Sequence, residues 1–375
     1  MTFRLPTRLR QRRPLLDKLG DLTGLVLTRF AGVRPRRPAP GPFNVTLTKD
    51  PGCREASSEL LDRFSTLSGQ THALSDDPWR YFWARDRLAF LPFHELTSTL
   101  IAWRDPVGPA EAVAGLIEHF RAYAATRGKH AVVLGVSRSA VEALPPASFD
   151  SVWIGTEPFF DLATWNTRGK AGMKVRLACN HVRRLGATVR EADPLGDARD
   201  RQAIARVEAA WKSVRPERCN NSFLRTAALA DTYRRRYFVV ETARGMESFV
   251  ACSPVSRRGQ YLQDLVRMPD APRGANELAV LTALTTFIAE GAQFATGGIV
   301  PFFHPDSYRS RSNRITSGTG TLGWVVRHFD RLFHFAGLQQ FRAKFVPTRV
   351  VDIYALLWPG ILTPSLAWDI RSLLS

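Results

Sequence analysis

Apolar side chains recur at helical spacing from Val113 to Phe120. A proline at position 109 precedes this stretch and Gly128 follows it, residues that favour the start and the end of a helix. The pattern predicts a helix over 109–127 with one buried face. Apolar runs at 131–136 and from Ser151 onward predict buried strands next to it.

A second helix is predicted over 170–185, with Gly186 at its end. At 100° per residue its apolar side chains share one face, which we expect to pack: Val175, Ala178, Cys179, Val182 and Leu185. The other face carries Arg176, Asn180, Arg183 and Arg184. A solvated basic face and a contact with tRNA phosphates both fit this pattern.

The second half of the chain predicts a helix, three antiparallel strands, a helix and a strand. These elements are expected at 203–214, 237–242, 247–252, 260–267, 275–290 and 294–300. Their order is that of the acetyltransferase-like fold. The first half of the chain predicts a strand, a helix and a strand, which is the order at the end of the same fold. We therefore expect an α/β (α+β) protein of two tandem acetyltransferase-like (GNAT) domains, with mixed central sheets flanked by helices.

Breaks in the pattern suggest a division of the chain. Residues 1–42 are a basic arm ending in a proline-rich linker, 43–195 a first domain and 196–375 a second, catalytic domain. The arm can contact phosphates or remain a solvated tail. The apolar run near residue 22 is interrupted and lacks a cleavage pattern, so we do not expect export.

Charge narrows the choice of partners. The chain has 375 residues with 52 Lys and Arg against 34 Asp and Glu, a formal charge of +18. This excess calls for a polyanion, which can be RNA, DNA or an anionic bilayer. The four cysteines lie far apart and predict reduced thiols rather than a zinc site or disulfides. No apolar run approaches the roughly 20 residues of a spanning helix, so we expect a cytoplasmic protein at the inner face of the membrane.

Six short stretches carry a family resemblance. They are Asp105–Gly108, Phe160–Leu162, Cys179–Ala187, Asp264–Arg267, Pro269–Gly274 and Phe335–Phe345. In this order they resemble the phosphatidylglycerol lysyltransferase family, whose catalytic part is a tandem of acetyltransferase-like domains. Two lysines usually precede the last phenylalanine in the family, whereas here Arg342 takes the first position and only Lys344 remains, which leaves the acceptor open.

The resemblance implies transfer of an aminoacyl group from aminoacyl-tRNA to phosphatidylglycerol or a related lipid. The ester on the tRNA is already activated, so no cofactor is expected besides this co-substrate. Three alternatives stay open: a soluble acceptor with the same donor, a coenzyme A-dependent N-acyltransferase, and an RNA-binding protein without activity. The sequence does not indicate which amino acid is carried.

By resemblance, the candidate catalytic residues are Asp264, Arg267 and Lys344. Asp264 can bind the aminoacyl ammonium group or accept a proton, and Arg267 can hold the ribose–phosphate end. A salt bridge between these two residues at a sheet edge is the structural alternative. Lys344 and Arg342, two apart, would share a face on a strand and stabilise an oxyanion or a phosphate.

Other residues are candidates for phosphate binding. Arg273 and Gly274 precede a predicted helix whose first amides favour an anion, of tRNA or of a lipid headgroup. Arg176, Arg183 and Arg184 are the corresponding candidates on the basic helix. His304 and Asp306, before Arg309, Arg311 and Arg314, more simply form an exposed loop. The aromatic cluster at 79–83 suits base stacking, but core packing is the commoner role.

Overall fold

The computed structural model describes residues 44–47, 51–74, 79–214, 227–301, 335–360 and Asp369. The expectations for the basic arm at 1–42 and for the loop around His304 and Asp306 lie outside these residues.

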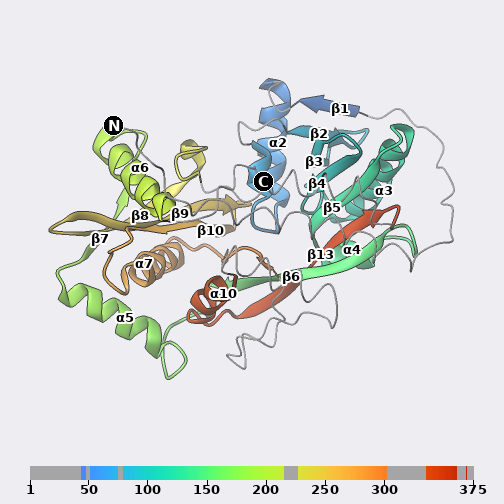
Figure 1. Ribbon diagram of the computed structural model, residues 1–375. Helices are drawn as coiled ribbons and strands as arrows, with labels where there is room; N and C mark the ends of the chain where they lie inside the picture. The colour runs from blue at the N-terminus through green and yellow to red at the C-terminus, as the bar shows by residue number, and fades with distance from the viewer. Residues whose placement is uncertain are drawn as a thin grey trace, which may run out of the picture.

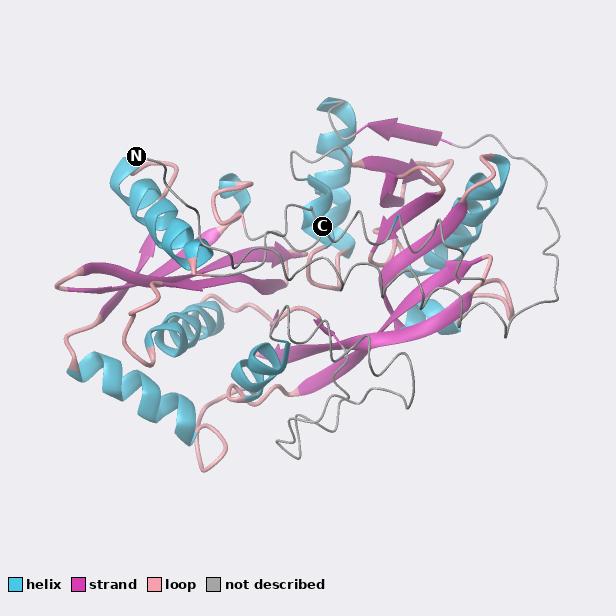
Figure 2. Ribbon diagram, viewed as in Figure 1, coloured by secondary structure: helices cyan, strands magenta, loops and turns pink. Residues whose placement is uncertain are grey.

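The described strands form one mixed sheet (Figures 1 and 2). The strands of the first half are β1 (Asn44–Leu47), β2 (Arg80–Trp83), β3 (Phe90–Glu95), β4 (Thr99–Trp103), β5 (His130–Ser137) and β6 (Asp150–Asp161). Those that follow are β7 (Thr188–Ala192), β8 (Arg236–Thr242), β9 (Gly245–Val255), β10 (Gly259–Arg267), β11 (Phe294–Thr296), β12 (Val300–Pro301) and β13 (Arg349–Trp358). Their order is β1-β2-β3-β4-β5-β13-β6-β11-β10-β9-β8-β7, and β12 also pairs with β6.

Helices cover both faces of this sheet (Figure 1). They are α2 (Pro51–Phe64), α3 (Ala110–Thr126), α4 (Arg138–Glu142), α5 (Met173–Arg184), α6 (Ala198–Ser213), α7 (Ala275–Ala289) and α10 (Phe335–Ala343), with 3₁₀ turns η1 (Gln70–Leu74) and η2 (Thr232–Arg234). In the second half α6 lies on one face, while α7 lies on the other and is covered in turn by α5. Because α7 lies between the sheet and α5, it is apolar on most sides.

The two halves repeat one motif. In the first half an antiparallel β2-β3-β4 meander is followed by α3 and by β5, which pairs parallel to β4. In the second half β8, β9 and β10 are followed by α7 and by β11, which pairs parallel to β10. This repeat confirms the expected fold of two tandem acetyltransferase-like units built on mixed sheets.

The last strand returns to the first half. β13 pairs antiparallel with both β5 and β6, and β6 extends beyond it to pair with β11. β7, from the N-terminal side of the predicted boundary at residue 195, pairs with β8. The sheet is therefore not divided at residue 195. A strand from before this residue, β7, lies in the second half of the sheet, and a strand from after it, β13, lies in the first.

The helix predictions agree with the structure because each helix has a periodic apolar face. α3 buries Leu116, Ile117 and Phe120, and α5 buries Val175, Cys179 and Val182. One residue was misassigned: Leu185 caps α5 and is exposed. The aromatic cluster of Trp79, Tyr81, Phe82 and Trp83 is buried, as core packing predicts.

Three other predictions were wrong in detail. α6 begins at Ala198, five residues earlier than expected, because Asp197 accepts a hydrogen bond from the Arg199 amide as its N-cap. The strand expected over 294–300 is interrupted by a turn at Gly297–Gly298. Arg342 lies in the last turn of α10 and Lys344 just after it, so the two are not on a strand.

Candidate functional site

The site lies where two parallel strands of the second half separate. β10 pairs with β11 over three residues only, ending at Tyr261 and Thr296. A β-bulge between Leu262 and Asp264 then bends β10, while β11 ends in the Gly297–Gly298 turn. A side chain at Gly298 would lie 2.9 Å from the Tyr261 hydroxyl, and Gly298 has φ +78°, so this turn needs glycine.

A small cavity lies near this point, between the two halves, and the ring of His72 in its lining is 6.5 Å from that of Tyr261. It lies between η1 of the first half and the η2, β9 and β10 segments of the second. We call it the junction pocket, and its lining residues are Thr71, His72, Leu74, Asp231, Arg234, Arg235, Ser253 and Gln263. Both halves therefore contribute to it.

Three polar side chains form a hydrogen-bonded chain along the pocket. The Ser253 hydroxyl donates to Gln263 Oε1 at 2.5 Å, and Gln263 Nε2 lies 3.0 Å from His72 Nε2. Burial, together with Arg235 and Arg104, lowers the pKa of His72 to about 3. The imidazole is thus neutral, and its Nε2 accepts a hydrogen bond from the Gln263 amide N–H.

Asp264 lies beside the pocket as a buried carboxylate. Its Oδ2 accepts a hydrogen bond from Arg235 Nη1 at 3.0 Å, and the same nitrogen also donates to the carbonyl of Ala227. Desolvation raises the pKa of Asp264 to about 6, although Arg235 acts to lower it. A carboxylate that titrates near neutrality in a pocket is a candidate for ammonium binding or proton transfer.

Ion pairs hold the two halves together around the pocket. Arg234, at the end of η2, donates to Asp62 and to Ser58 of α2. Arg54 of the same helix donates to the Tyr233 hydroxyl at 3.2 Å. These contacts fix η2, and with it the neighbouring Arg235, against the first half.

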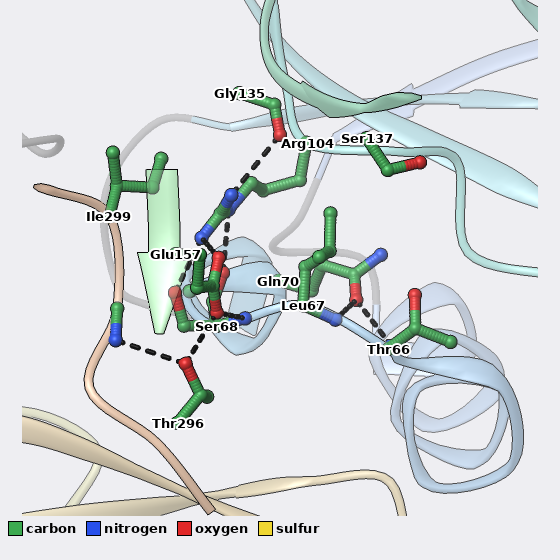
Figure 3. Close-up of polar contacts among 12 residues, drawn as sticks. Thr66, Leu67, Ser68, Gln70, Arg104, Gly135, Ser137, Glu157, Thr296 and Ile299 are labelled. Atoms are coloured by element: carbon green, nitrogen blue, oxygen red, sulfur yellow. Dashed lines mark hydrogen bonds and ion pairs between the residues drawn. The ribbon is translucent and has the colours of Figure 1, made fainter. Parts of the chain in front are cut away.

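A buried ion pair supports the junction from below the surface (Figure 3). Arg104 Nη2 and Glu157 Oε2 are 2.7 Å apart, and both side chains are almost fully buried. Glu157 Oε1 also accepts hydrogen bonds from the Ser68 amide at 2.9 Å and the Thr296 hydroxyl at 2.7 Å. The Thr296 oxygen in turn accepts from the amide of Gly298. The pair therefore ties β4 and β6 to η1 and to the turn after β11.

Arg104 has an unusual backbone for a long side chain, with φ +68°. Its Nε donates to the Ser68 carbonyl at 2.6 Å and its Nη1 to the Gly135 carbonyl at 3.1 Å. A side chain at Gly135 would lie 3.0 Å from the Arg104 Cδ. The surrounding hydrogen bonds hold this strained conformation in place.

Two cationic side chains, Arg342 and Lys344, lie on the α7 face of the sheet, opposite the face that carries Asp264. Arg342 Nη1 donates to the carbonyls of Gly298 and Ile299 at 2.9 and 2.7 Å. Lys344 Nζ donates to Glu277, in the first turn of α7, at 2.9 Å. Both side chains lie close to the Gly297–Gly298 turn or to the start of α7, and Lys344 keeps 36% of its side chain exposed.

The structure does not bring the three predicted catalytic residues together. Asp264 lies on the α6 face, where its register neighbour Ala251 belongs to the core. Arg267 follows three residues later, so alternation along the strand directs it to the other face, where it is exposed. The structural alternative, a salt bridge between these two residues, is not formed either, because Asp264 pairs with Arg235. Lys344 lies on the α7 face.

Two predicted phosphate-binding elements do meet. Gly274 has φ +101°, and a side chain there would lie 2.1 Å from the carbonyl oxygen of Ala178 in the middle of α5. Arg273 is exposed beside this contact, as are Arg183 and Arg184 on α5, while Arg176 donates to the Thr167 carbonyl. The turn before α7 and the basic helix are therefore neighbours on one face.

Sequence reasoning missed His72, Gln263, Arg235 and the Arg104–Glu157 pair. Glu157 interrupts a strand that is otherwise apolar from Val152 to Phe160, and Arg104 directly follows the apolar strand β4. A charge in such surroundings signals a buried pair. His72 and Gln263 gave no such signal, since their meeting depends on contact between the halves.

The described part of the chain holds no group of three or more His, Cys, Asp or Glu residues that could hold a metal ion. None of its helices combines the length and apolar character that crossing a bilayer requires. Cys53, Cys179 and Cys252 are buried free thiols.

Solved structures share this fold. The C-terminal domain of a protein from Agrobacterium fabrum, described as a putative lysylphosphatidylglycerol synthetase, matches with a TM-score of 0.69 and 19% identity, over 86% of this chain and 96% of that one. The L-PGS structure from Bacillus licheniformis matches with a TM-score of 0.68 and 18% identity, over 87% and 97%. At these identities the likeness shows the fold.

Curated relatives share part of their length with this chain. The lysylphosphatidylglycerol biosynthesis bifunctional protein LysX of Rhodococcus jostii is 26% identical over 253 residues, 66% of this chain and 22% of the relative. Phosphatidylglycerol lysyltransferase of Staphylococcus aureus is 22% identical over 305 residues, 78% and 34%. The chain thus spans about a fifth to a third of the relatives it matches here.

The family model described as phosphatidylglycerol lysyltransferase, C-terminal, matches residues 60–357. This range runs from α2 to β13 and includes both halves and the junction pocket between them. The chain therefore belongs to the phosphatidylglycerol lysyltransferase C-terminal family.

Proposed function

We propose that this protein transfers an aminoacyl group from aminoacyl-tRNA to a hydroxyl group of phosphatidylglycerol or a related lipid. The observation that carries the proposal is the family match over residues 60–357, which spans every element that builds the junction pocket. The names of the relatives supply the reaction class. The proposal concerns this chain, which is shorter than those relatives.

The proposed reaction is a transesterification. A lipid hydroxyl attacks the ester carbonyl, a new C–O bond forms, and the bond to the tRNA ribose breaks. The hydroxyl proton leaves through a base and the departing ribose oxygen takes up a proton. The protein must align the two substrates, move the proton and stabilise the oxyanion, and the activated ester makes a further cofactor unnecessary.

The two faces of the separated strands suit the two substrates. We place the ammonium end of the aminoacyl group at the junction pocket, beside which ionised Asp264 can hold this group or accept the hydroxyl proton. We place the lipid phosphodiester on the α7 face, within reach of Lys344 and the exposed Arg273. We place the approach of these groups near the point where β10 and β11 stop pairing, at Tyr261 and Thr296.

The charge of the molecule supports two anionic partners. The net charge of +18 favours association with tRNA and with an anionic bilayer, and both attractions weaken with salt. We therefore also propose that the protein acts at the inner face of the membrane.

A soluble acceptor is the alternative that the unusual C-terminal signature favoured. Arg342 departs from the family lysine, yet its guanidinium is occupied by two backbone carbonyls of the glycine turn. In this position it supports the turn rather than selecting an acceptor, which favours the lipid.

The proposal is tested with a pool of radiolabelled aminoacyl-tRNAs and total lipid extract. We expect labelled lipid to form only with intact tRNA, and ribonuclease to abolish it. Label appearing solely in the water phase would favour a soluble acceptor, and label from an acyl-coenzyme A donor alone would contradict the proposal. Identifying the labelled lipid also shows which amino acid is carried.

A further inference from the structure

Helix α5 exposes apolar side chains on its outer face. Met173 is 42% exposed, Leu177 57% and Leu185 55%. The opposite side of the helix packs on the core through Val175 and Cys179, which are fully buried. Figure 1 shows α5 as the outermost element on the α7 side of the sheet. Its exposed apolar side chains therefore face solvent.

Two of these residues, Met173 and Leu177, lie on one stripe of the helix, whereas Leu185 caps the helix to one side of it. At 100° per residue, Met173, Leu177 and Arg184 point within about 40° of one another. Val175 and Val182 lie roughly opposite to them, and both are buried. The stripe is apolar in the first half of the helix and polar in the second, where it carries Asn180 and Arg184.

The sequence around the stripe carries basic but no acidic residues. From Leu162 to Arg190 the sequence contains no Asp or Glu, whereas its Lys and Arg residues are Arg168, Lys170, Lys174, Arg176, Arg183, Arg184 and Arg190. Lys170, Lys174 and Arg183 are exposed on or next to α5. Such a helix carries charge that is complementary to an anionic surface.

We propose that the outer face of α5 docks on an anionic lipid surface. Met173 and Leu177 insert between the headgroups, and the flanking Lys and Arg side chains contact lipid phosphates. This inference rests on the proposed function, because a lipid acceptor would lie in the membrane to which α5 docks. It deepens that function because α5 packs on the α7 face of the sheet, where we place the lipid phosphate near Arg273 and Lys344.

RNA is the other polyanion that this charge can attract. An RNA phosphate backbone contacts cationic and hydrogen-bonding side chains and gains nothing from exposed Met173 or Leu177. A bilayer surface gains from both kinds of residue. The apolar half of the stripe therefore favours the lipid.

The test is flotation of the full chain with vesicles, without tRNA. We expect binding to phosphatidylcholine vesicles that contain phosphatidylglycerol and little binding to phosphatidylcholine alone. The double variant Met173→Ser/Leu177→Ser weakens this binding by about tenfold or more. Lys170→Gln and Lys174→Gln each weaken it by about fivefold, and added salt weakens it further. Leu88→Ser, equally exposed on the first half at 55%, is the matched control and binds as the wild type.

An activity assay separates this inference from the proposed function. With lipid in vesicles the Met173→Ser/Leu177→Ser variant loses transfer, while with detergent-dispersed lipid it keeps the wild-type rate. The inference is overturned if the Met173→Ser/Leu177→Ser variant binds vesicles as strongly as the wild type. It is also overturned if the lysine variants bind vesicles normally but no longer retain tRNA. Docking without transfer from any aminoacyl-tRNA contradicts the proposed function alone.

Discussion

Asp264 combines burial with a titratable charge next to a pocket that both halves line. In Asp264→Asn the amide oxygen can still accept the Arg235 hydrogen bond, so we expect the variant to fold. Its carboxylate charge is lost, and we predict that transfer falls by about a hundredfold or more. Asp270→Asn, an exposed carboxylate paired with Arg244, is the control and retains activity. A near wild-type rate for Asp264→Asn would remove Asp264 from the proposed chemistry.

The raised pKa of Asp264 predicts how activity and stability depend on pH. The carboxylate is ionised above about pH 6, so transfer rises through this value. The pKa of Asp264 is higher in the folded state than in the unfolded chain, so the folded state binds more protons. The stability that this gives is fully present below the ordinary pKa of 3.8 and is lost as the pH rises through about 6. In urea unfolding the wild type should therefore lose stability relative to Asp264→Asn over this range. A pH-independent difference between the two proteins contradicts this assignment.

At the scale of single residues, the sequence offered Asp264 as a candidate but gave no sign of its partners. The resemblance around Asp264–Arg267 falls on β10, whereas the bulge before Asp264 and its Arg235 partner depend on the folded sheet. Alternation along the strand already separates Asp264 from Arg267. The meeting of His72 with Gln263 joins residues 191 positions apart and no local pattern encodes it.

Among the elements, the start of α7 is held by its contact with α5. Gly274→Ala places a methyl group against the Ala178 carbonyl in addition to a strained φ of +101°. We predict destabilisation clearly above 1 kcal/mol, measured by urea unfolding. Gly291→Ala, after the other end of α7, has φ +79° and open space around it, so it carries the strain alone and costs about 1 kcal/mol. Equal effects of the two substitutions would show that the α5 contact is unimportant.

The Arg104–Glu157 pair joins elements of both halves and should be sensitive to substitution. Glu157→Gln leaves the Arg104 charge buried without its partner, and we predict a loss of about 3–5 kcal/mol in the free energy of unfolding. The exposed Arg138–Glu142 pair is the control, where Glu142→Gln should cost less than about 1 kcal/mol. A small effect at Glu157 would contradict its role as an anchor of the junction.

Elements with local signals were the predictable part of the fold. Helices α3 and α5 have apolar periodicity, α7 is apolar on most sides, glycine follows all three, and the β8-β9-β10 meander has short turns. The place of β13 between β5 and β6 could not be predicted, because it follows from pairing between distant segments. The prediction for Arg342 and Lys344 was wrong for another reason. Two residues that are two positions apart can share a strand face, but they can equally lie at the end of a helix.

For the molecule as a whole, one continuous sheet runs through both halves. β6 and β13 connect them, and the junction pocket takes residues from each. The basic, partly apolar outer face of α5 lies on the side where we place the lipid, opposite the face of the aminoacyl group. This arrangement allows the two anionic substrates to approach from different sides of the sheet.

The central claim is tested most directly by following the discharge of purified aminoacyl-tRNA by the purified protein. With phosphatidylglycerol present, the account predicts that label leaves the tRNA and appears as aminoacyl lipid, and that Asp264→Asn largely prevents this. If no aminoacyl-tRNA loses its amino acid to phosphatidylglycerol or to any other acceptor in total lipid extract, the account is wrong.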